Sequence, residues 1–154
     1  MPTLTTRYFN QLEYSDDAPF RFAAGIPGFE EHTAFLLIQQ PQTKPLVFMQ
    51  SLRDPSVCFV QLPAIVVDPD YRLELSTEEA LALGLPEAEA PQNRPELLSL
   101  VLLTFVENAD PVVNLMSPIV LNLSTRRGIQ AIQLGSNYSL RYPLALESQA
   151  AACS

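Results

Sequence analysis

Proline restricts this chain more than any other residue type: the 154 residues hold 14 prolines and only 5 glycines. Proline interrupts helices and sheet ladders, so we expect short elements joined by rigid turns. Between the prolines, apolar and polar residues alternate in several short segments, such as T-T-R-Y-F at 5–9 and F-R-F-A at 20–23. Because alternation with a period of two is typical of strands, we predict a mainly β fold, a small antiparallel β-barrel-like domain.

The longest apolar run, at 97–106, reads L-L-S-L-V-L-L-T-F-V. A continuous run of this kind predicts a strand that is buried on both faces. Further along, S-T-R-R-G at 124–128 predicts a hairpin loop in which Gly128 supplies a positive φ. If the barrel interior is filled, the side chains from the long strand that fill it are expected to be Leu98, Leu100, Leu102 and Phe105.

One short helix has clear end signals. Ser76 and Glu79 have the spacing of a capping box, in which each side chain binds the backbone N–H of the other residue. A-L-A-L follows, and Gly84 and Pro86 then favour a helix end. We therefore predict one domain over 1–146 with a single short helix, and a flexible tail over 147–154.

The charge excludes some classes of partner. The net charge is −8, which disfavours direct binding of nucleic acid. Acid is concentrated between 68 and 96, where Arg72 and Arg94 are the only bases. This segment is either a solvated face or a docking face for a basic partner. Its acids are Asp68, Asp70, Glu74, Glu78, Glu79, Glu87, Glu89 and Glu96.

The chain lacks the signals of a membrane or exported protein. No apolar run reaches the roughly 18 residues that a membrane span needs, and the first residues have no signal-peptide core. The two cysteines, Cys58 and Cys153, make no disulfide framework. We therefore expect a reducing compartment, the cytoplasm, and a monomer with no membrane association.

A tight turn is predicted in the segment G-I-P-G-F-E at 25–30, which we call the Pro27 turn. Pro27 fixes φ, and Gly28 can adopt the left-handed region that a type II turn requires. The flanking Ile26 and Phe29 either fold inward as a plug or form an apolar anchor beside Glu30, as at a protein-binding site. The turn lacks the lysine and following helix of a phosphate-binding loop.

Catalysis has few candidate residues. His32 is the only histidine, and no serine or cysteine lies in a nucleophile motif. Asp68 and Asp70 could form half of a carboxylate site, so a small hydrolase is one alternative function. A barrel that holds a small ligand is another. We expect no metal or cofactor, because the potential ligands are too few and too far apart.

The order of several motifs resembles the bacterial flagellar assembly factor FliW family over about residues 5–144. No single motif is decisive, but their order and spacing are specific. They include Y-F at 8–9, G-I-P-G-F-E at 25–30, M-Q-S-L-R-D-P at 49–55, N-L-M-S-P-I-V-L-N at 114–122, R-R-G-I-Q at 126–130 and Y-S-L-R-Y-P-L at 138–144.

The resemblance implies a non-enzymatic regulator with a small β-barrel. Members of the family bind flagellin and the translational repressor CsrA, which they antagonise allosterically. Flagellin translation is thereby coupled to flagellin secretion. The implied partners are therefore flagellin and CsrA, and CsrA is a basic protein that an acidic domain would attract.

Two partner surfaces follow as hypotheses. The first is the acidic middle of the chain, with Tyr71 as an apolar anchor and a rim of carboxylates formed by Asp70, Glu74, Glu78 and Glu79. The second is the Pro27 turn, because a rigid turn presents side chains at low entropic cost. Its contact residues are expected to be Ile26, Pro27, Phe29 and Glu30.

Overall fold

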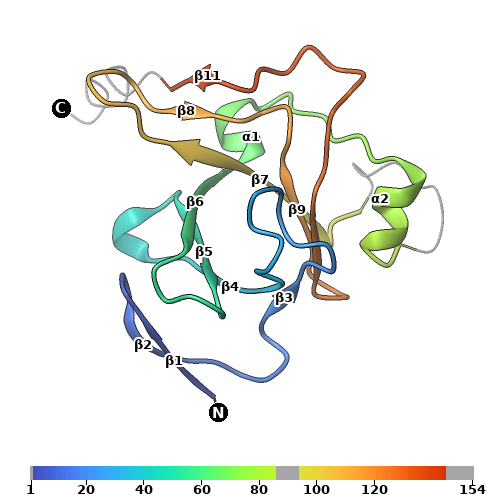
Figure 1. Cartoon of the computed structure of the whole chain (residues 1–154). Coiled ribbons are helices and arrows are strands. Elements are labelled where there is room, and N and C mark those ends of the chain that lie inside the picture. The colour runs from blue at the N-terminus through green and yellow to red at the C-terminus, as the bar shows by residue number, and fades with distance from the viewer. Residues whose placement is uncertain (1, 86–93, 145–154) are drawn as a thin grey trace.

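The computed structural model describes residues 2–85 and 94–144, and its centre is a closed seven-stranded barrel (Figure 1). The strands follow one another around the barrel in the order β7–β6–β5–β4–β3–β10–β9, and β9 pairs back onto β7. They are β3 (Phe20–Arg21), β4 (Ala34–Ile38), β5 (Val47–Ser51), β6 (Cys58–Pro63), β7 (Leu97–Thr104), β9 (Ile119–Asn122) and β10 (Arg127–Gln130).

The prediction of a mainly antiparallel barrel is confirmed. Within the barrel only the contact between β3 and β10 is parallel, whereas the other neighbouring strands are antiparallel. The tail predicted over 147–154 lies outside the described residues.

Shorter elements extend the barrel at two places. The hairpin of β1 (Thr3–Thr6) and β2 (Asn10–Glu13) forms a separate two-stranded sheet. At the far end of β7, β8 (Val112–Val113) pairs with that strand, and β11 (Tyr142–Pro143) pairs with β8. A 3₁₀ turn, η1 (Pro41–Thr43), lies between β4 and β5.

Strand β7 separates two hydrophobic clusters, as its lack of alternation predicts. Leu100 points into the cluster that also holds Phe20, Phe35 and Met49. Val101, the next residue, points into the second cluster on the opposite face. Leu98 and Leu102 pack against the first cluster as predicted. Phe105 was expected there too but is 68% exposed, because β7 ends at Thr104 and the side chain lies beyond the barrel.

The second cluster is covered by segments outside the barrel. Tyr71 belongs to this second cluster. The Tyr71 hydroxyl donates to the Leu115 carbonyl at 2.8 Å, and the Tyr71 ring stacks on that of Tyr138 with the ring centroids 4.4 Å apart. Gln133 is buried, and its amide both donates to the Glu74 carbonyl and accepts from the Glu74 N–H, each at 2.8 Å. These contacts hold the acidic middle segment against the sheet.

The predicted helix is α2 (Thr77–Ala82), and its capping box is present. The Ser76 hydroxyl accepts from the Glu79 N–H at 3.1 Å, and the Glu79 carboxylate accepts from the Ser76 N–H at 2.9 Å. Gly84 ends the helix with φ +77°. The prediction of a single helix is incomplete: α1 (Ala64–Val67) adds one further turn, closed by the Asp68 N–H donating to the Ala64 carbonyl.

The prediction for Gly128 is wrong in its reason. In the hairpin between β9 and β10 the positive φ of +59° belongs to Arg126. Gly128 is required for space instead, since a Cβ at this position would lie 2.5 Å from the Phe22 ring and 2.8 Å from Leu121. The absence of a side chain lets Phe22 pack directly on β10.

Candidate protein-binding groove

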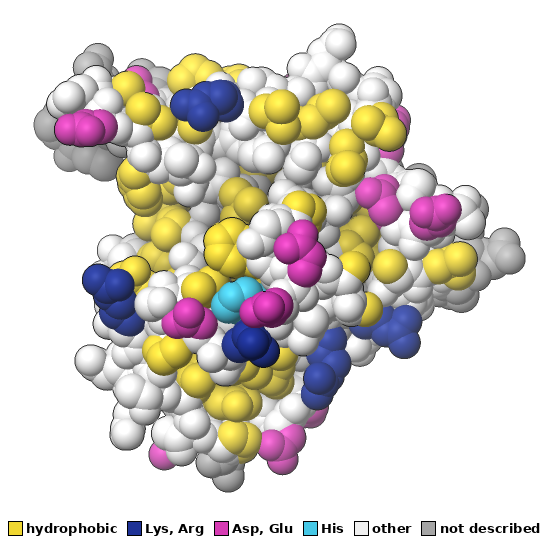
Figure 2. Space-filling model, viewed as in Figure 1, with side chains coloured by type: hydrophobic (Ala, Val, Ile, Leu, Met, Phe, Trp, Pro, Cys, Tyr) yellow, Lys and Arg dark blue, Asp and Glu magenta, His cyan; other side chains and the backbone are white. Residues whose placement is uncertain are grey.

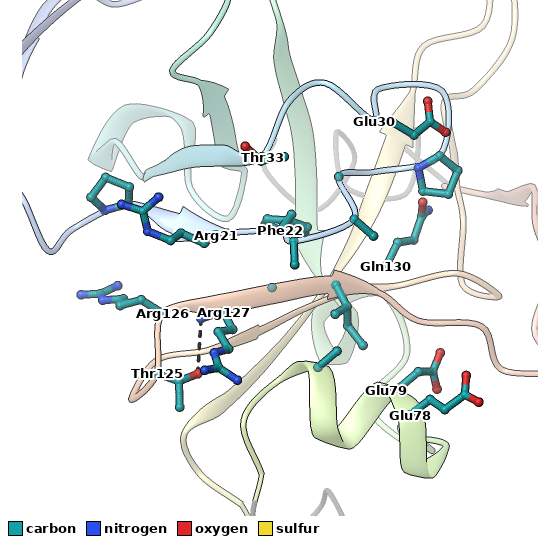
Figure 3. A pocket seen from close by; sticks show the side chains of 18 of the residues that line it. Arg21, Phe22, Glu30, Thr33, Glu78, Glu79, Thr125, Arg126, Arg127 and Gln130 are labelled. Atoms are coloured by element: carbon teal, nitrogen blue, oxygen red, sulfur yellow. Dashed lines mark hydrogen bonds between the residues drawn. The ribbon is translucent and has the colours of Figure 1, made fainter.

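A groove with a volume of about 1100 Å³ lies between the Pro27 turn, the helix α2 and the strand β10 (Figure 3). We call it the β10 groove. Phe22, Gly128 and Ile129 are apolar residues of its lining. Its polar lining comes from four parts of the chain: Asp16, Asp17, Arg21, Glu30, Thr33, Glu78, Glu79, Thr125, Arg126, Arg127 and Gln130.

The Pro27 turn is rigid for local reasons. The Phe29 N–H donates to the Ile26 carbonyl at 2.6 Å, and Gly28 has φ +85°, as a type II turn requires. The Gly28 N–H also donates to the Glu30 carboxylate at 3.0 Å. This hydrogen bond holds the pKa of the exposed Glu30 carboxyl below its usual range, because it stabilises the charged form.

The two apolar residues of the Pro27 turn behave differently. Ile26 is 2% exposed and packs in the barrel cluster, so it is a plug. Phe29 is 38% exposed and meets Phe59 edge-on, with ring centroids 5.0 Å apart. Phe29 thus keeps part of its ring available at the surface, although it is not among the residues that line the groove.

Hydrogen bonds to the β9–β10 hairpin hold the C-terminal end of α2. The Leu83 carbonyl accepts from the Asn122 side-chain amide and from the Thr125 hydroxyl, each at 2.9 Å. Leu83 itself is fully buried, so the helix end is anchored in the core. The position of α2 beside the groove is therefore fixed by residues some forty positions away in sequence.

Glu79 fixes the other side of α2 against the sheet. One carboxylate oxygen accepts from the Ser76 N–H, and the other accepts from the Ile132 N–H at 3.0 Å. Both oxygens are thus used in holding the helix. Glu78 is exposed and makes no such bond among the described residues, so its charge is available to a ligand.

The charges in the groove are separated. Arg21 and Arg126 lie toward one end, and the carboxylates of Glu30, Glu78 and Glu79 lie toward the other (Figure 3). Arg126 stacks over the Phe20 ring, 4.7 Å from its centroid, which keeps the guanidinium beside the start of β3.

The two partner surfaces predicted from the sequence share one groove in part. Pro27 and Glu30 from one proposed surface, and Glu78 and Glu79 from the other, line the same groove. Asp70 and Glu74 are exposed acids outside it. Tyr71, expected as an exposed anchor, is 8% exposed and lies in the core, because its ring and hydroxyl both have partners there.

The arginines of the groove have no predicted role in a site. Arg126 and Arg127 fall in the predicted hairpin loop, and Arg21 falls in a predicted strand. They join the groove because β3 and β10 meet at the pair Arg21–Arg127. No local pattern signals a contact between strands so far apart in the chain.

The candidates for catalysis have structural partners. His32 Nδ1 lies 2.7 Å from the Ser51 hydroxyl, which is fully buried and accepts from the N–H groups of Arg53 and Asp54. This junction ties the Pro27 turn to the turn after β5. The Asp68 carboxylate accepts from the Asp70 N–H at 3.0 Å, as in a loop that is closed by an aspartate.

The described part of the chain contains neither a metal site nor a membrane-spanning helix. Over residues 2–85 and 94–144, no three His, Cys, Asp or Glu side chains gather closely enough to hold a metal ion. No helix within these same ranges has the length and apolar character needed to cross a membrane.

The surface in Figure 2 is mixed rather than uniformly acidic. On this face acidic, basic and hydrophobic side chains are interspersed, and the histidine has acidic and basic neighbours. Two of the acids counted in the sequence, Glu87 and Glu89, lie outside the described residues. The acidic end of the groove is defined by Glu30, Glu78 and Glu79.

The structure is thus of the class of small closed β-barrels, here with a surface groove that is lined by apolar and charged side chains. Residues 3–144 match the family model described as FliW protein, and the chain belongs to this family. Flagellar assembly factor FliW of Syntrophomonas wolfei is 30% identical over 148 residues, covering 96% of this chain and 91% of that relative. The protein of the same name from Thermotoga sp. strain RQ2 is 34% identical over 141 residues, covering 90% of this chain and 91% of its own.

A solved structure agrees with this assignment. The crystal structure of a flagellar assembly factor FliW superimposes with a TM-score of 0.80 at 30% identity, covering 92% of this chain and 96% of that one. The resemblance noted in the sequence is thus confirmed at the level of the family and the fold.

Proposed function

We propose that this chain is a non-enzymatic regulator that binds flagellin and the translational repressor CsrA in turn. It antagonises CsrA allosterically when flagellin is scarce and releases it when flagellin accumulates. Flagellin translation would thereby follow flagellin secretion. The proposal places this exchange in the cytoplasm, with the barrel acting as a monomer that binds proteins and neither nucleic acid nor membranes.

The observation that carries the proposal is that part of each predicted partner surface, Pro27 with Glu30 and Glu78 with Glu79, lines the one β10 groove. The groove joins a rigid turn, a capped helix and a strand, so its side chains are held in place before a partner arrives. Its acidic end suits a basic repressor, since opposite charges accelerate the encounter and fix the orientation.

The test is a binding titration with purified CsrA and, separately, with purified flagellin. We expect wild-type protein to bind both, and Glu78→Lys to weaken CsrA binding and flatten its dependence on salt. Glu78 is chosen alone, because reversing Glu79 would also remove the cap of α2. Glu107→Lys is the matched control: Glu107 is an exposed acid outside the groove.

An error in the proposed partners and an error in the proposed binding site give different results. If wild-type protein binds neither CsrA nor flagellin, the proposed function fails. If Glu78→Lys and Glu107→Lys bind CsrA as tightly as wild type, CsrA binds away from the acidic end of the groove. A competition titration completes the test: added flagellin should displace CsrA, whereas a stable ternary complex would contradict binding in turn.

A further inference from the structure

The strand β10 has one edge that β3 covers only at its start. The register joins the two strands through the single pair Arg127–Arg21. The Arg21 N–H donates to the Arg126 carbonyl at 2.8 Å, and the Phe22 N–H, which strand alternation directs to the opposite edge, donates to the Thr33 carbonyl on the β4 side. Among the described residues no further pair between β3 and β10 follows Arg127–Arg21, so the edge of β10 beyond Gly128 is not covered by β3.

The register of β10 with β9 shows which backbone groups of β10 point toward the uncovered edge. The Ala131 N–H donates to Pro118 at 2.9 Å, and the Gln133 N–H donates to Met116 at 2.8 Å, so odd-numbered residues here bond across to the β9 side. Even-numbered residues point their backbone groups the other way. Ile132 agrees with this rule, because its N–H donates to Glu79 across the groove.

Gln130 belongs to the even-numbered set, so its N–H and C=O face the β10 groove. Among the described residues neither group has a partner, whereas Ile132 two positions later is capped by α2. Gln130 is also one of the residues that line the groove. An open sheet edge of this kind is a template for pairing with an added strand.

We propose that the β10 groove binds an extended segment of a partner protein, which adds as a strand to the free edge of β10. This inference rests on the proposed function and specifies how the partner is held. The segment carries a basic side chain toward the end where Glu30 and Glu78 lie opposite each other (Figure 3). The basic residues drawn in Figure 3 lie away from that end, with Arg21 and Arg126 toward the other one.

An extended segment fits these features better than a helix. The groups offered by β10 are a backbone donor and acceptor, and a helix has already used its own backbone groups internally. A strand supplies both partners and presents alternate side chains to the two walls of the groove. The carboxylate of Glu79 then continues the row of bonded groups at Ile132.

The first measurement uses the free protein. Amide exchange followed by NMR should show the Gln130 N–H exchanging much faster than those of Ile129 and Ala131, which bond across to the β9 side. Adding purified CsrA or flagellin should then slow exchange at Gln130 by about tenfold or more, since a strand hydrogen bond protects the amide. A Gln130 amide that is protected in the free protein would overturn the proposal.

The second measurement removes the donor. Gln130→Pro deletes the N–H that faces the groove and leaves the bonds to β9 in place, as proline does on an edge strand. Gln130→Ala keeps the N–H but loses the side chain and its hydrogen bond to the Ser117 carbonyl at 3.1 Å, so it measures how much of any loss comes from the side chain. We expect Gln130→Pro to weaken partner binding about tenfold or more relative to Gln130→Ala.

The results distinguish this inference from the proposed function. If CsrA or flagellin binds wild type and Gln130→Pro equally, and exchange at Gln130 is unchanged, the partner binds elsewhere and only this inference fails. If neither binds wild type, both fail. Should Gln130→Pro not fold, the exchange measurement on wild type with each partner decides.

Discussion

The wall formed by β4, β5 and β6 and the seam between β3 and β10 are unlike parts of one barrel. In the wall, β5 pairs with each neighbour over four residues. At the seam a single residue pair joins two parallel strands. The strands of the wall are held by continuous ladders of backbone pairs, whereas the sparsely bonded seam leaves backbone groups and charged side chains for a ligand.

The largest expected effect comes from the wall. Met49→Ala removes a fully buried side chain from the barrel cluster and leaves a cavity. We expect it to lower the free energy of unfolding by about 3 kcal/mol, measured by urea denaturation. The control is Leu134→Ala, at a residue 82% exposed, which should change stability by less than about 0.5 kcal/mol.

The affinity of the Met49→Ala variant for its partners tests whether the wall and the seam are independent. Because Met49 does not line the β10 groove, Met49→Ala should bind CsrA and flagellin normally at temperatures where it remains folded. A loss of affinity in a folded Met49→Ala protein would mean that the wall and the seam are energetically coupled.

The next effect is on the seam itself. Gly128→Ala places a methyl group 2.5 Å from the Phe22 ring, so either the ring or β10 must shift. We expect destabilisation of about 2 kcal/mol together with weaker partner binding, since the groove lining moves. Gly135→Ala is the matched control, because the nearest atom to its added methyl would be a Glu74 oxygen at 3.5 Å. Equal stability of the two variants would contradict close packing at the seam.

Elements set by local signals could be foreseen from the sequence better than the seam. The 97–106 run predicts a strand buried on both faces, and the capping box at Ser76 predicts α2, because both signals act between near neighbours. The groove depends on contacts between distant segments, such as Arg21 with Arg127 and Leu83 with Asn122. Alternation indicates which residues form strands but not which strands pair in parallel at a single residue.

The misplacement of Tyr71 has the same cause. Its neighbours Asp70 and Arg72 are charged, so the local pattern is that of a surface segment. The hydroxyl is satisfied by the Leu115 carbonyl 44 residues away, and the ring by Tyr138. An aromatic residue with a polar group can be buried wherever such a partner exists, and a single sequence does not reveal that partner.

A smaller effect is expected at the helix that forms one wall of the groove. Ser76→Ala removes the acceptor of the Glu79 N–H and leaves the charge of α2 unchanged. We expect a loss of about 1 kcal/mol in unfolding free energy. CsrA binding should weaken several-fold, because Glu78 is no longer held in position. Thr77→Ala, at the exposed neighbour, should preserve both stability and affinity, because alanine has the higher helix propensity; a similar loss there would contradict the assignment of the effect to the Ser76 cap.

The smallest effect is a pH dependence at the Pro27 turn. The Gly28 N–H bound to the Glu30 carboxylate keeps the pKa of that carboxyl below its ordinary value of 4.5. A group with a lowered folded-state pKa stabilises the fold above its unfolded pKa, and this contribution is lost as the pH falls through the folded value. Wild type should therefore be slightly more stable than Glu30→Gln at neutral pH, and the difference should shrink as the pH falls below 4.5 and through the lowered folded-state value, as measured by urea denaturation.

Glu107→Gln serves as the control for this comparison, since it removes one acid from an exposed site away from the turn. If Glu107→Gln shows the same dependence on pH as Glu30→Gln, net charge explains the effect and the Gly28 bond does not. If only Glu30→Gln shows this pH dependence, the hydrogen bond from the Gly28 N–H to the Glu30 carboxylate stabilises the turn. A ligand that binds this end of the groove through a basic side chain then meets a carboxylate that is already charged and fixed in place, which keeps the entropic cost of binding low.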